Sequence, residues 1–354
     1  MKEVSKFGYV PELDGLRGVA ILAVMLHHAG ILKGGFIGVD VFFVISGYLI
    51  TSLLVREYDS TGTIKLSQFY ARRLLRLGPA MVILLTVYCV IGSWFLYAKA
   101  VLIEALTALF CLTNWARAFQ FHPPNLLGHT WSLSIEEQFY VLWPITLWLL
   151  LRSRVSRKAI VWVAILVALS SWSLRILLVL NGASAMRLFN GLDTRLDGVM
   201  TGCALGVFFS FSPVQEWGRY VRWRNVAMTS AAIMLLVFSL TTHWCDKSLY
   251  YWKSMVVALC ALAILMGLRS ADDNLVKRCL VARWLVWVGS ISYGLYLFHY
   301  PVFRVILRCG MNRWLGVTVA MIASFCIAAA SFYLVEKPFL RLRKRFSRET
   351  CNPP

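Results

Sequence analysis

The chain has 354 residues, of which 59% are hydrophobic and 15% are charged, and its mean hydropathy is +0.67. This composition excludes an ordinary soluble globular domain, and no stretch alternates strongly enough to argue for a β-barrel. The formal net charge of +19 comes from basic residues in short clusters between apolar runs. That pattern is typical of membrane orientation, so we expect no nucleic-acid partner.

Apolar runs of spanning length recur along the chain, and we count about ten of them. We therefore predict an all-α fold, a polytopic transmembrane bundle, with a cytoplasmic segment at 1–12, a transmembrane domain at 13–335 and a basic cytoplasmic tail at 336–354. The predicted spans are 13–31, 37–55, 79–97, 132–151, 159–180, 196–212, 226–242, 252–268, 285–306 and 315–335.

Basic residues gather in the loops after the second, fourth, sixth and eighth runs and in the tail. The positive-inside rule then predicts that both termini are cytoplasmic. Segment 98–130 falls on the opposite side, and its apolar part is interrupted by Glu104, Asn114 and Arg117. We expect an amphipathic or re-entrant piece there rather than a further span.

Two further observations concern processing and metals. The polar start, Met1 to Pro11, lacks the charged-then-apolar pattern of a cleaved signal, so we expect the first helix to remain in the mature protein. The nine cysteines include no C-x-x-C pair and lie mostly inside apolar runs. We expect neither a metal site nor a disulfide framework.

The first run carries ionisable groups at both ends. Arg17 and His28 are eleven positions apart, which places them about 20° apart around a helix and about 16 Å apart along it. Ionisable groups at membrane depth face a cavity or a partner. This stripe is a candidate catalytic surface, with His28 as a general base. His27, about 80° away, would face elsewhere.

A glycine-rich turn follows, and Asp40 enters the second run after it. Asp40 either orients the His28 imidazole or is a carboxylate favoured by the macrodipole at a helix start. Arg72, Arg73 and Arg76 form one basic cluster, which suits phosphate oxygens and equally fits the positive-inside rule.

Three later motifs combine polar groups with apolar runs. Trp131 to Tyr140 contains Glu136 and Glu137, read either as part of a site or as a charged helix N-terminus. Arg195 and Asp197 start the sixth run, where a local salt bridge is the simplest reading. The ninth run holds a set of residues that suggests a polar path and a kinked helix, namely Ser292, Tyr293, His299 and Pro301.

Together and in this order, these stretches resemble the acyltransferase-3 family of integral membrane acyltransferases. The resemblance covers about residues 10–345. It rests on the Arg-x10-His pattern of Arg17 and His28, on Gly38 to Tyr48, on the arginine cluster followed by Pro79, on Trp131 to Tyr140, and on Ser292 to His299. The close, Glu336-Lys337-Pro338, is also similar.

The resemblance implies a membrane O-acyltransferase of the cell inner (plasma) membrane. It would move an acyl group, usually acetyl, from cytoplasmic acyl-coenzyme A to a hydroxyl of an extracytoplasmic or lipid-linked glycan, such as lipopolysaccharide O-antigen or exopolysaccharide. Some relatives carry an additional SGNH hydrolase-like domain; because the tail here is short and basic, we expect a stand-alone form without it. No cofactor would be permanently bound, since acetyl-coenzyme A is the donor substrate.

The residues can be given roles on this reading. Arg72, Arg73, Arg76 and Arg17 would hold the donor; His28, Arg17, Asp40 and Glu137 would form the catalytic set; and Ser292, Tyr293, His299, Arg195 and Asp197 would line the substrate path. His28 would act as base or form an acyl-histidine. The alternative function is a transporter or flippase of a glycan or small polar metabolite, although no inverted repeat is visible. The sequence does not indicate an oligomeric state.

Overall fold

The computed structural model describes residues 9–95, 97–121, 125–212, 221–269 and 274–343. Within these ranges the regular secondary structure is entirely helical, which confirms the all-α prediction. The first half contains α1 (Pro11–His28), η1 (Gly35–Ile37), α2 (Gly38–Thr61), α3 (Leu66–Phe95), α4 (Ala98–Leu109), α5 (Thr113–Ala118), η2 (Gly128–Thr130), α6 (Trp131–Arg152) and α7 (Arg157–Leu180). The second half contains α8 (Ala185–Asn190), α9 (Leu196–Phe211), α10 (Val221–Thr241), η4 (Leu249–Lys253), α11 (Ser254–Leu268), α12 (Leu275–Leu280), α13 (Arg283–Ser290), α14 (Ser292–Ile306), α15 (Arg313–Ser331), η5 (Phe332–Glu336) and α16 (Lys337–Arg343).

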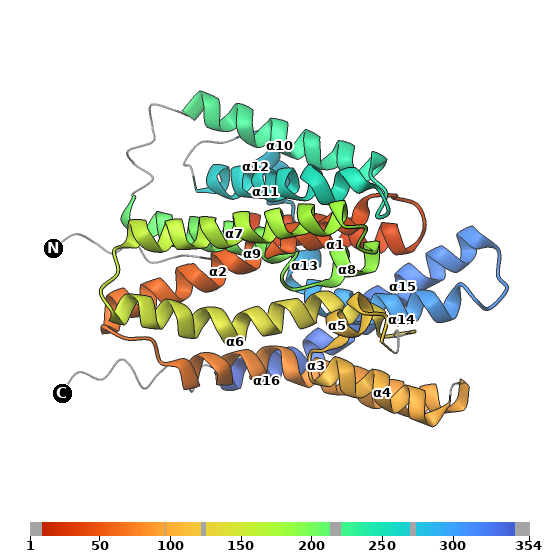
Figure 1. Ribbon diagram of the computed structural model, residues 1–354. Coiled ribbons are helices and arrows are strands. Elements are labelled where there is room, and N and C mark those ends of the chain that lie inside the picture. Colours follow the sequence, from red (N-terminus) through yellow and green to blue (C-terminus); the bar gives the residue numbers. More distant parts are fainter. Residues whose placement is uncertain (1–8, 96, 122–124, 213–220, 270–273, 344–354) are drawn as a thin grey trace.

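The long helices run along one common direction (Figure 1). Among the described residues, six helical segments are long and apolar enough to cross a membrane, namely Gly35–Thr61, Leu66–Gly92, Arg157–Leu180, Trp223–Thr241, Leu249–Leu268 and Arg313–Leu342. The other predicted runs also fall on helices, including the shorter apolar helix Leu196–Phe211. The total of about ten spans and the cytoplasmic placement of the termini stay predictions.

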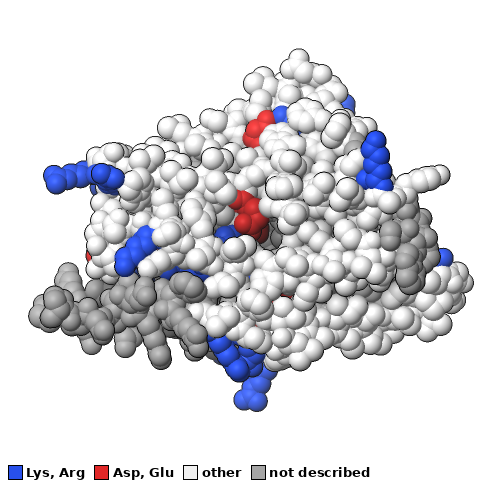
Figure 2. All heavy atoms as spheres, turned by 90° about the horizontal axis from the view of Figure 1, so that it is seen from below, with Lys and Arg blue, Asp and Glu red and all other residues white. Residues whose placement is uncertain are grey.

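The surface agrees with a lipid environment. Large apolar side chains are exposed along the outer helices, for example Val82 on α3, Leu166 on α7, Leu236 on α10 and Ile322 on α15. Most of the face seen from below carries neither basic nor acidic side chains (Figure 2). Such a surface is stable where hydrocarbon, rather than water, contacts it.

The structure differs from the predicted spans at two places. Helix α3 begins at Leu66, so the arginine cluster lies within its first turns instead of in a loop, and Pro79 is inside the helix. The predicted ninth run is split at Ile291 into α13 and α14. The split has a packing reason, since α13 packs along α1 whereas α14 packs along α15.

Segment 98–130 forms short helices rather than another span. Helix α4 has 12 residues, or about 18 Å of helix, which is too short to cross the hydrocarbon core. It packs against α3, and the carboxylate of the buried Glu104 accepts hydrogen bonds from the Tyr88 hydroxyl and, at 2.5 Å, from the backbone N–H of Leu127. This carboxylate therefore connects α3 and α4 to the residue that precedes η2.

Helices α2 and α9 have the most extensive contact of the helix pairs that the structure describes. A Cβ added to Gly47 would lie 2.0 Å from the carbonyl oxygen of Val199, and one added to Gly202 would lie 2.1 Å from that of Val44. Glycines therefore let the two backbones touch, as is common where lipid supplies no hydrophobic drive for association.

We expect Gly202→Ala to destabilise the protein by about 1–3 kcal/mol, the usual cost of overpacking. Gly198→Ala on the same helix is the matched control, because the nearest atom to its added Cβ is 3.6 Å away. Unfolding by SDS titration in mixed micelles measures both. Equal stability of the two variants would contradict the close α2–α9 contact.

Two buried ion pairs connect α2, α7 and α9. Arg195 Nη2 donates to Asp40 Oδ1 at 2.6 Å, and Arg175 Nη2 donates to Asp197 Oδ2 at 2.6 Å. The simple reading of a local Arg195–Asp197 salt bridge is therefore wrong. Residue Arg195 precedes α9 with φ −127° and ψ 0°, and each of the two residues has a partner on a different helix.

Asp40 also differs from its predicted role as the residue that orients His28, because its hydrogen-bond partner is Arg195. Its second oxygen, Oδ2, is buried and has no hydrogen-bond partner among the described residues. The pair fixes the start of α2 against the start of α9, and with it the neighbouring residue Val39.

We expect Arg195→Met to cost about 3–5 kcal/mol, because it leaves the Asp40 carboxylate buried without its cation. The double variant Asp40→Asn with Arg195→Met should recover part of that loss. Arg187→Met is the matched control, since its partner Asp193 has a 37% exposed side chain and exposed pairs contribute about 0–1 kcal/mol. SDS titration again gives the free energies, and equal losses in Arg195→Met and Arg187→Met would contradict the assignment.

Candidate functional site

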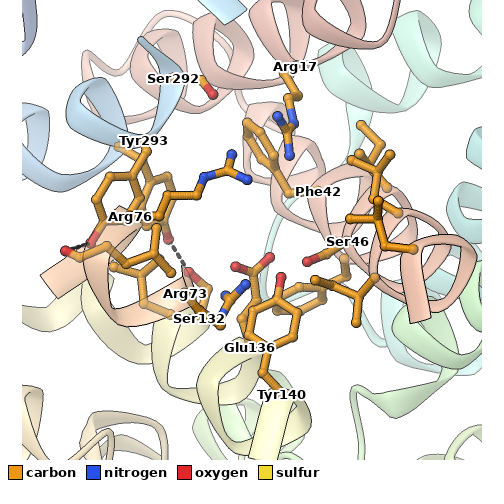
Figure 3. Close-up of a pocket in the computed structure, with 18 of the residues that line it drawn as sticks. Arg17, Phe42, Ser46, Arg73, Arg76, Ser132, Glu136, Tyr140, Ser292 and Tyr293 are labelled. Carbon is orange, nitrogen blue, oxygen red and sulfur yellow. Dashed lines mark hydrogen bonds between the residues drawn. The ribbon is translucent and has the colours of Figure 1, made fainter. Parts of the chain in front are cut away.

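A cavity of about 220 Å³ opens between α1, α2, α3, α6 and α14. Four arginines line it, namely Arg17, Arg56, Arg73 and Arg76. Figure 3 shows Arg17 and Arg76 reaching toward its centre from two different sides, with the Glu136 carboxylate and Tyr140 below them. Its remaining wall is largely apolar and comes from α2, with Phe42, Leu49, Ile50 and Leu53. We call this space the arginine cavity.

A second cavity of about 170 Å³ has a different lining. Three histidines face it, His27, His28 and His129, together with Arg117. Aromatic side chains supply much of the remaining wall, namely Phe36, Trp131, Phe189, Trp244 and Tyr296. We call this space the histidine cavity.

The two cavities share two lining residues, Val39 and Tyr296. The Tyr296 hydroxyl hydrogen-bonds the Ser132 hydroxyl and donates to the carbonyl oxygen of His129 at 3.0 Å. One layer of side chains thus separates the cavities. Arg17 lines the arginine cavity and His28 lines the histidine cavity. The predicted stripe on α1 therefore extends from one cavity to the other.

The partner of His28 is another histidine. His28 Nδ1 lies 3.0 Å from His299 Nε2, and the ring of Tyr300 packs at 4.9 Å between centroids. His27 instead places Nδ1 2.9 Å from the carbonyl oxygen of Lys33. The two neighbouring histidines have different hydrogen-bond partners, as the helical offset predicts, although both line the histidine cavity.

The arginine cluster divides between two environments. Arg73 and Arg76 line the arginine cavity, whereas Arg72 Nη2 donates to Glu57 Oε2 at 3.3 Å and is not a lining residue. Arg73 also donates to both oxygens of Glu137, with the shortest distance 3.0 Å, and its guanidinium lies 3.0 Å from the centroid of the Tyr140 ring.

Glu136, rather than Glu137, faces the arginine cavity. Adjacent residues of a helix point about 100° apart, so only one of the two carboxylates can face a given side. The signal in the sequence is the spacing of four that joins Ser132, Glu136 and Tyr140, all of which line this cavity. The predicted residue Glu137 is not a lining residue and instead accepts hydrogen bonds from Arg73.

The residues predicted to line the substrate path lie in three different places. Ser292 and Tyr293 line the arginine cavity, and the Tyr293 hydroxyl donates to the carbonyl oxygen of Leu77 at 2.8 Å. His299 is buried behind His28. Arg195 and Asp197 are not lining residues of either cavity, since both lie in the ion pairs described above.

Three lining residues of the histidine cavity had no predicted role, namely Arg117, His129 and Tyr296. Arg117 Nε donates to Asn190 Oδ1 at 2.9 Å, and His129 Nε2 lies 2.9 Å from the carbonyl oxygen of Leu297. Each comes from a segment distant in sequence from α1, so periodicity within one helix does not reveal them. Within the described ranges, no group of three or more His, Cys, Asp or Glu residues is placed to hold a metal ion.

Comparison with known proteins places this geometry in a family. The model of the acyltransferase domain family acyltransferase-3 matches residues 10–333. The peptidoglycan O-acetyltransferase OatA of Listeria monocytogenes is 32% identical over 96% of this chain and 57% of its own length. A putative O-acetyltransferase of Staphylococcus aureus is 32% identical over 94% of this chain and 58% of its own length.

A third relative, the putative peptidoglycan O-acetyltransferase YrhL of Bacillus subtilis, is 31% identical over 93% of this chain and 55% of its own length. The chain thus spans a little more than half the length of these relatives. No solved structure matches. The helical membrane bundle and the family match over nearly the whole chain lead to one conclusion: the chain belongs to the acyltransferase-3 family.

Proposed function

We propose that this enzyme transfers an acetyl group from acetyl-coenzyme A, held in the arginine cavity, to a glycan hydroxyl presented in the histidine cavity. The observation that carries the proposal is the contact of two chemically different cavities at Val39 and Tyr296. We place the donor on the cytoplasmic side of the plasma membrane and the acceptor, an extracytoplasmic or lipid-linked saccharide, on the other.

The arginine cavity has the chemistry that the donor requires. Coenzyme A carries several phosphates, and arginine guanidinium groups bind phosphate oxygens with paired, charge-assisted hydrogen bonds. Arg17, Arg73 and Arg76 line the space together with the apolar wall of α2. In our proposal the phosphates bind the arginines, and the long pantetheine arm lies along the apolar wall so that the thioester reaches Tyr296.

The histidine cavity has the chemistry of a saccharide site. Flat aromatic rings such as Trp131, Phe189 and Trp244 provide apolar faces with polar edges, which suit the two faces of a sugar ring. Polar groups at the same wall, His28 and Arg117, are available to orient hydroxyls. The names of two relatives specify peptidoglycan as their acceptor, and we propose a glycan acceptor of this general class here.

The reaction then follows from the position of His28. Its imidazole removes the proton of the acceptor hydroxyl while the oxygen attacks the thioester carbonyl carbon. The tetrahedral oxyanion needs a donor at the boundary. In our proposal the Ser132 or the Tyr296 hydroxyl supplies it by turning its O–H from its present acceptor to the oxyanion. The carbon–sulfur bond breaks, and the thiolate leaves with the proton. An acyl-histidine formed on His28 is a second route to the same product.

We expect His28→Ala to lower acceptor-dependent release of coenzyme A by about 10²–10⁴-fold, the usual contribution of a general base. His27→Ala should have a much smaller effect, because His27 hydrogen-bonds backbone carbonyls. The assay follows free thiol from acetyl-coenzyme A with purified protein in detergent, with and without a bacterial glycan fraction. No release by the wild type with either mixture would remove the acetyl-transfer proposal and favour a transporter.

We expect Arg76→Gln and Arg17→Gln each to weaken coenzyme A binding by about 10- to 100-fold, because a charge-assisted hydrogen bond contributes about 1.5–3 kcal/mol. Arg72→Gln is the matched control, since Arg72 pairs with Glu57 outside the cavity lining. Isothermal calorimetry in detergent gives the dissociation constants. A larger loss in Arg72→Gln than in Arg76→Gln would place the donor elsewhere.

A further inference from the structure

His299 is fully buried in α14 and is held by its own helix. Its Nδ1 lies 2.9 Å from the carbonyl oxygen of Leu295 and 2.8 Å from that of Tyr296. A carbonyl oxygen only accepts hydrogen bonds, so Nδ1 must carry the proton. The hydrogen-bond contacts of its ring nitrogens are to carbonyl oxygens and to His28, and none of them is to a carboxylate among the described residues. A buried imidazole without such a partner is neutral. The other nitrogen, Nε2, is therefore an acceptor.

This assignment determines which ring nitrogen of His28 carries the proton. His28 Nδ1 lies 3.0 Å from that Nε2 atom, and a hydrogen bond between them requires His28 Nδ1 to be the donor. A neutral imidazole has one N–H. His28 Nε2 is then left with a lone pair, and His28 lines the histidine cavity. We infer that His299 is a positioning residue that locks His28 in the Nδ1–H tautomer, so that Nε2 is the base that takes the acceptor proton.

The backbone of α14 is built to hold His299 in place. Pro301 has no N–H, so the carbonyl oxygen of Leu297, four residues earlier, loses its helical donor. His129 Nε2 lies 2.9 Å from that oxygen and replaces the missing donor. The proline-kinked part of α14 is thereby anchored to the segment before α6, at the wall of the histidine cavity.

The path of the proton through His28 rests on the proposed function. The acceptor O–H gives its proton to His28 Nε2, and the oxygen forms a bond to the thioester carbon. The imidazolium then has protons on both nitrogens and keeps its Nδ1–H bond to His299. When the carbon–sulfur bond breaks, Nε2 returns the proton to the departing thiolate. His28 regains its first tautomer, and no other reactant is needed.

The kinetic test compares His299→Leu with His299→Gln. Leucine removes the acceptor for His28 Nδ1–H, so we expect turnover at saturating acetyl-coenzyme A to fall about 100-fold, at the low end of the contribution of a general base, with the donor KM unchanged. Glutamine keeps an acceptor oxygen near the position of Nε2, and we expect it to restore at least a tenth of wild-type turnover. His243→Leu, outside both cavities, is the control for loss of an imidazole.

A spectroscopic test reads the tautomer directly. The chain has six histidines, and nitrogen NMR of ¹⁵N-histidine-labelled protein in detergent shows which ring nitrogen carries the proton. The His28 signals are identified by their loss in His28→Asn. We expect a proton on Nδ1 of His28 in the wild type and in His299→Gln, and a mixture of tautomers in His299→Leu.

The outcomes separate this inference from the proposed function. Loss of transfer in His28→Ala, together with full turnover in His299→Leu or a proton on Nε2 of wild-type His28, would overturn the role of His299 alone. Equal loss of turnover in His299→Leu and His299→Gln, with unchanged tautomers, would also overturn it. Full transfer in His28→Ala would instead overturn the proposed base. Coenzyme A binding and the SDS unfolding midpoint show whether each variant is folded.

Discussion

The structure depends on one constraint: a polar group inside a lipid-covered bundle must find its partner within the protein. Asp40 and Asp197 meet arginines from other helices at 2.6 Å. The carbonyl oxygen that Pro301 leaves without a helical donor meets His129. These contacts are distant in sequence, so satisfying each polar group also fixes how the helices pack. The same contacts place Val39, His28 and Tyr296 around the boundary between the cavities.

The contacts that hold the central helices together therefore also position the residues of the site. Close packing of α2 on α9 uses glycines where backbones touch, and the Arg195–Asp40 pair fixes the starts of the same two helices. Helix α2 then supplies the apolar wall of the arginine cavity. On the other side, α6 contributes Ser132, Glu136 and Tyr140 to that cavity from one face. The proposed transfer between a cytoplasmic donor and an extracytoplasmic acceptor would need such a rigid arrangement, because acyl transfer is sensitive to small displacements.

The sequence predicted the parts of this structure that depend on a single helix. Apolar length identified the helices, and the angle between residues of α1 placed Arg17 and His28 along one line. Residues of the family motifs line the two cavities because the helices that carry them each turn one face toward a cavity. Partner choice was not predictable, because pairs such as Asp40 with Arg195, or His28 with His299, join residues 155 and 271 positions apart. No periodicity within one helix carries that information.

Two smaller differences have equally specific causes. The start of α3 was placed too late because its first turns carry arginines, which lower hydropathy without preventing helix formation. Glu137 was predicted rather than Glu136, although the four-residue spacing with Ser132 and Tyr140 places Glu136 at the arginine cavity. In the second case the relevant signal was the direction of side chains around the helix, which average hydrophobicity does not report.

The layer of side chains between the cavities has a consequence for the cell that is separate from catalysis. Arginines on one side and histidines on the other, joined by an open wet path, would conduct protons or small anions and discharge the membrane potential. Val39 and the hydrogen-bonded hydroxyl of Tyr296 close that path with an apolar group and a hydroxyl that already has its partners. In the proposed enzyme, this layer would keep ions from crossing the bundle while leaving only one side-chain layer for the acetyl group to pass.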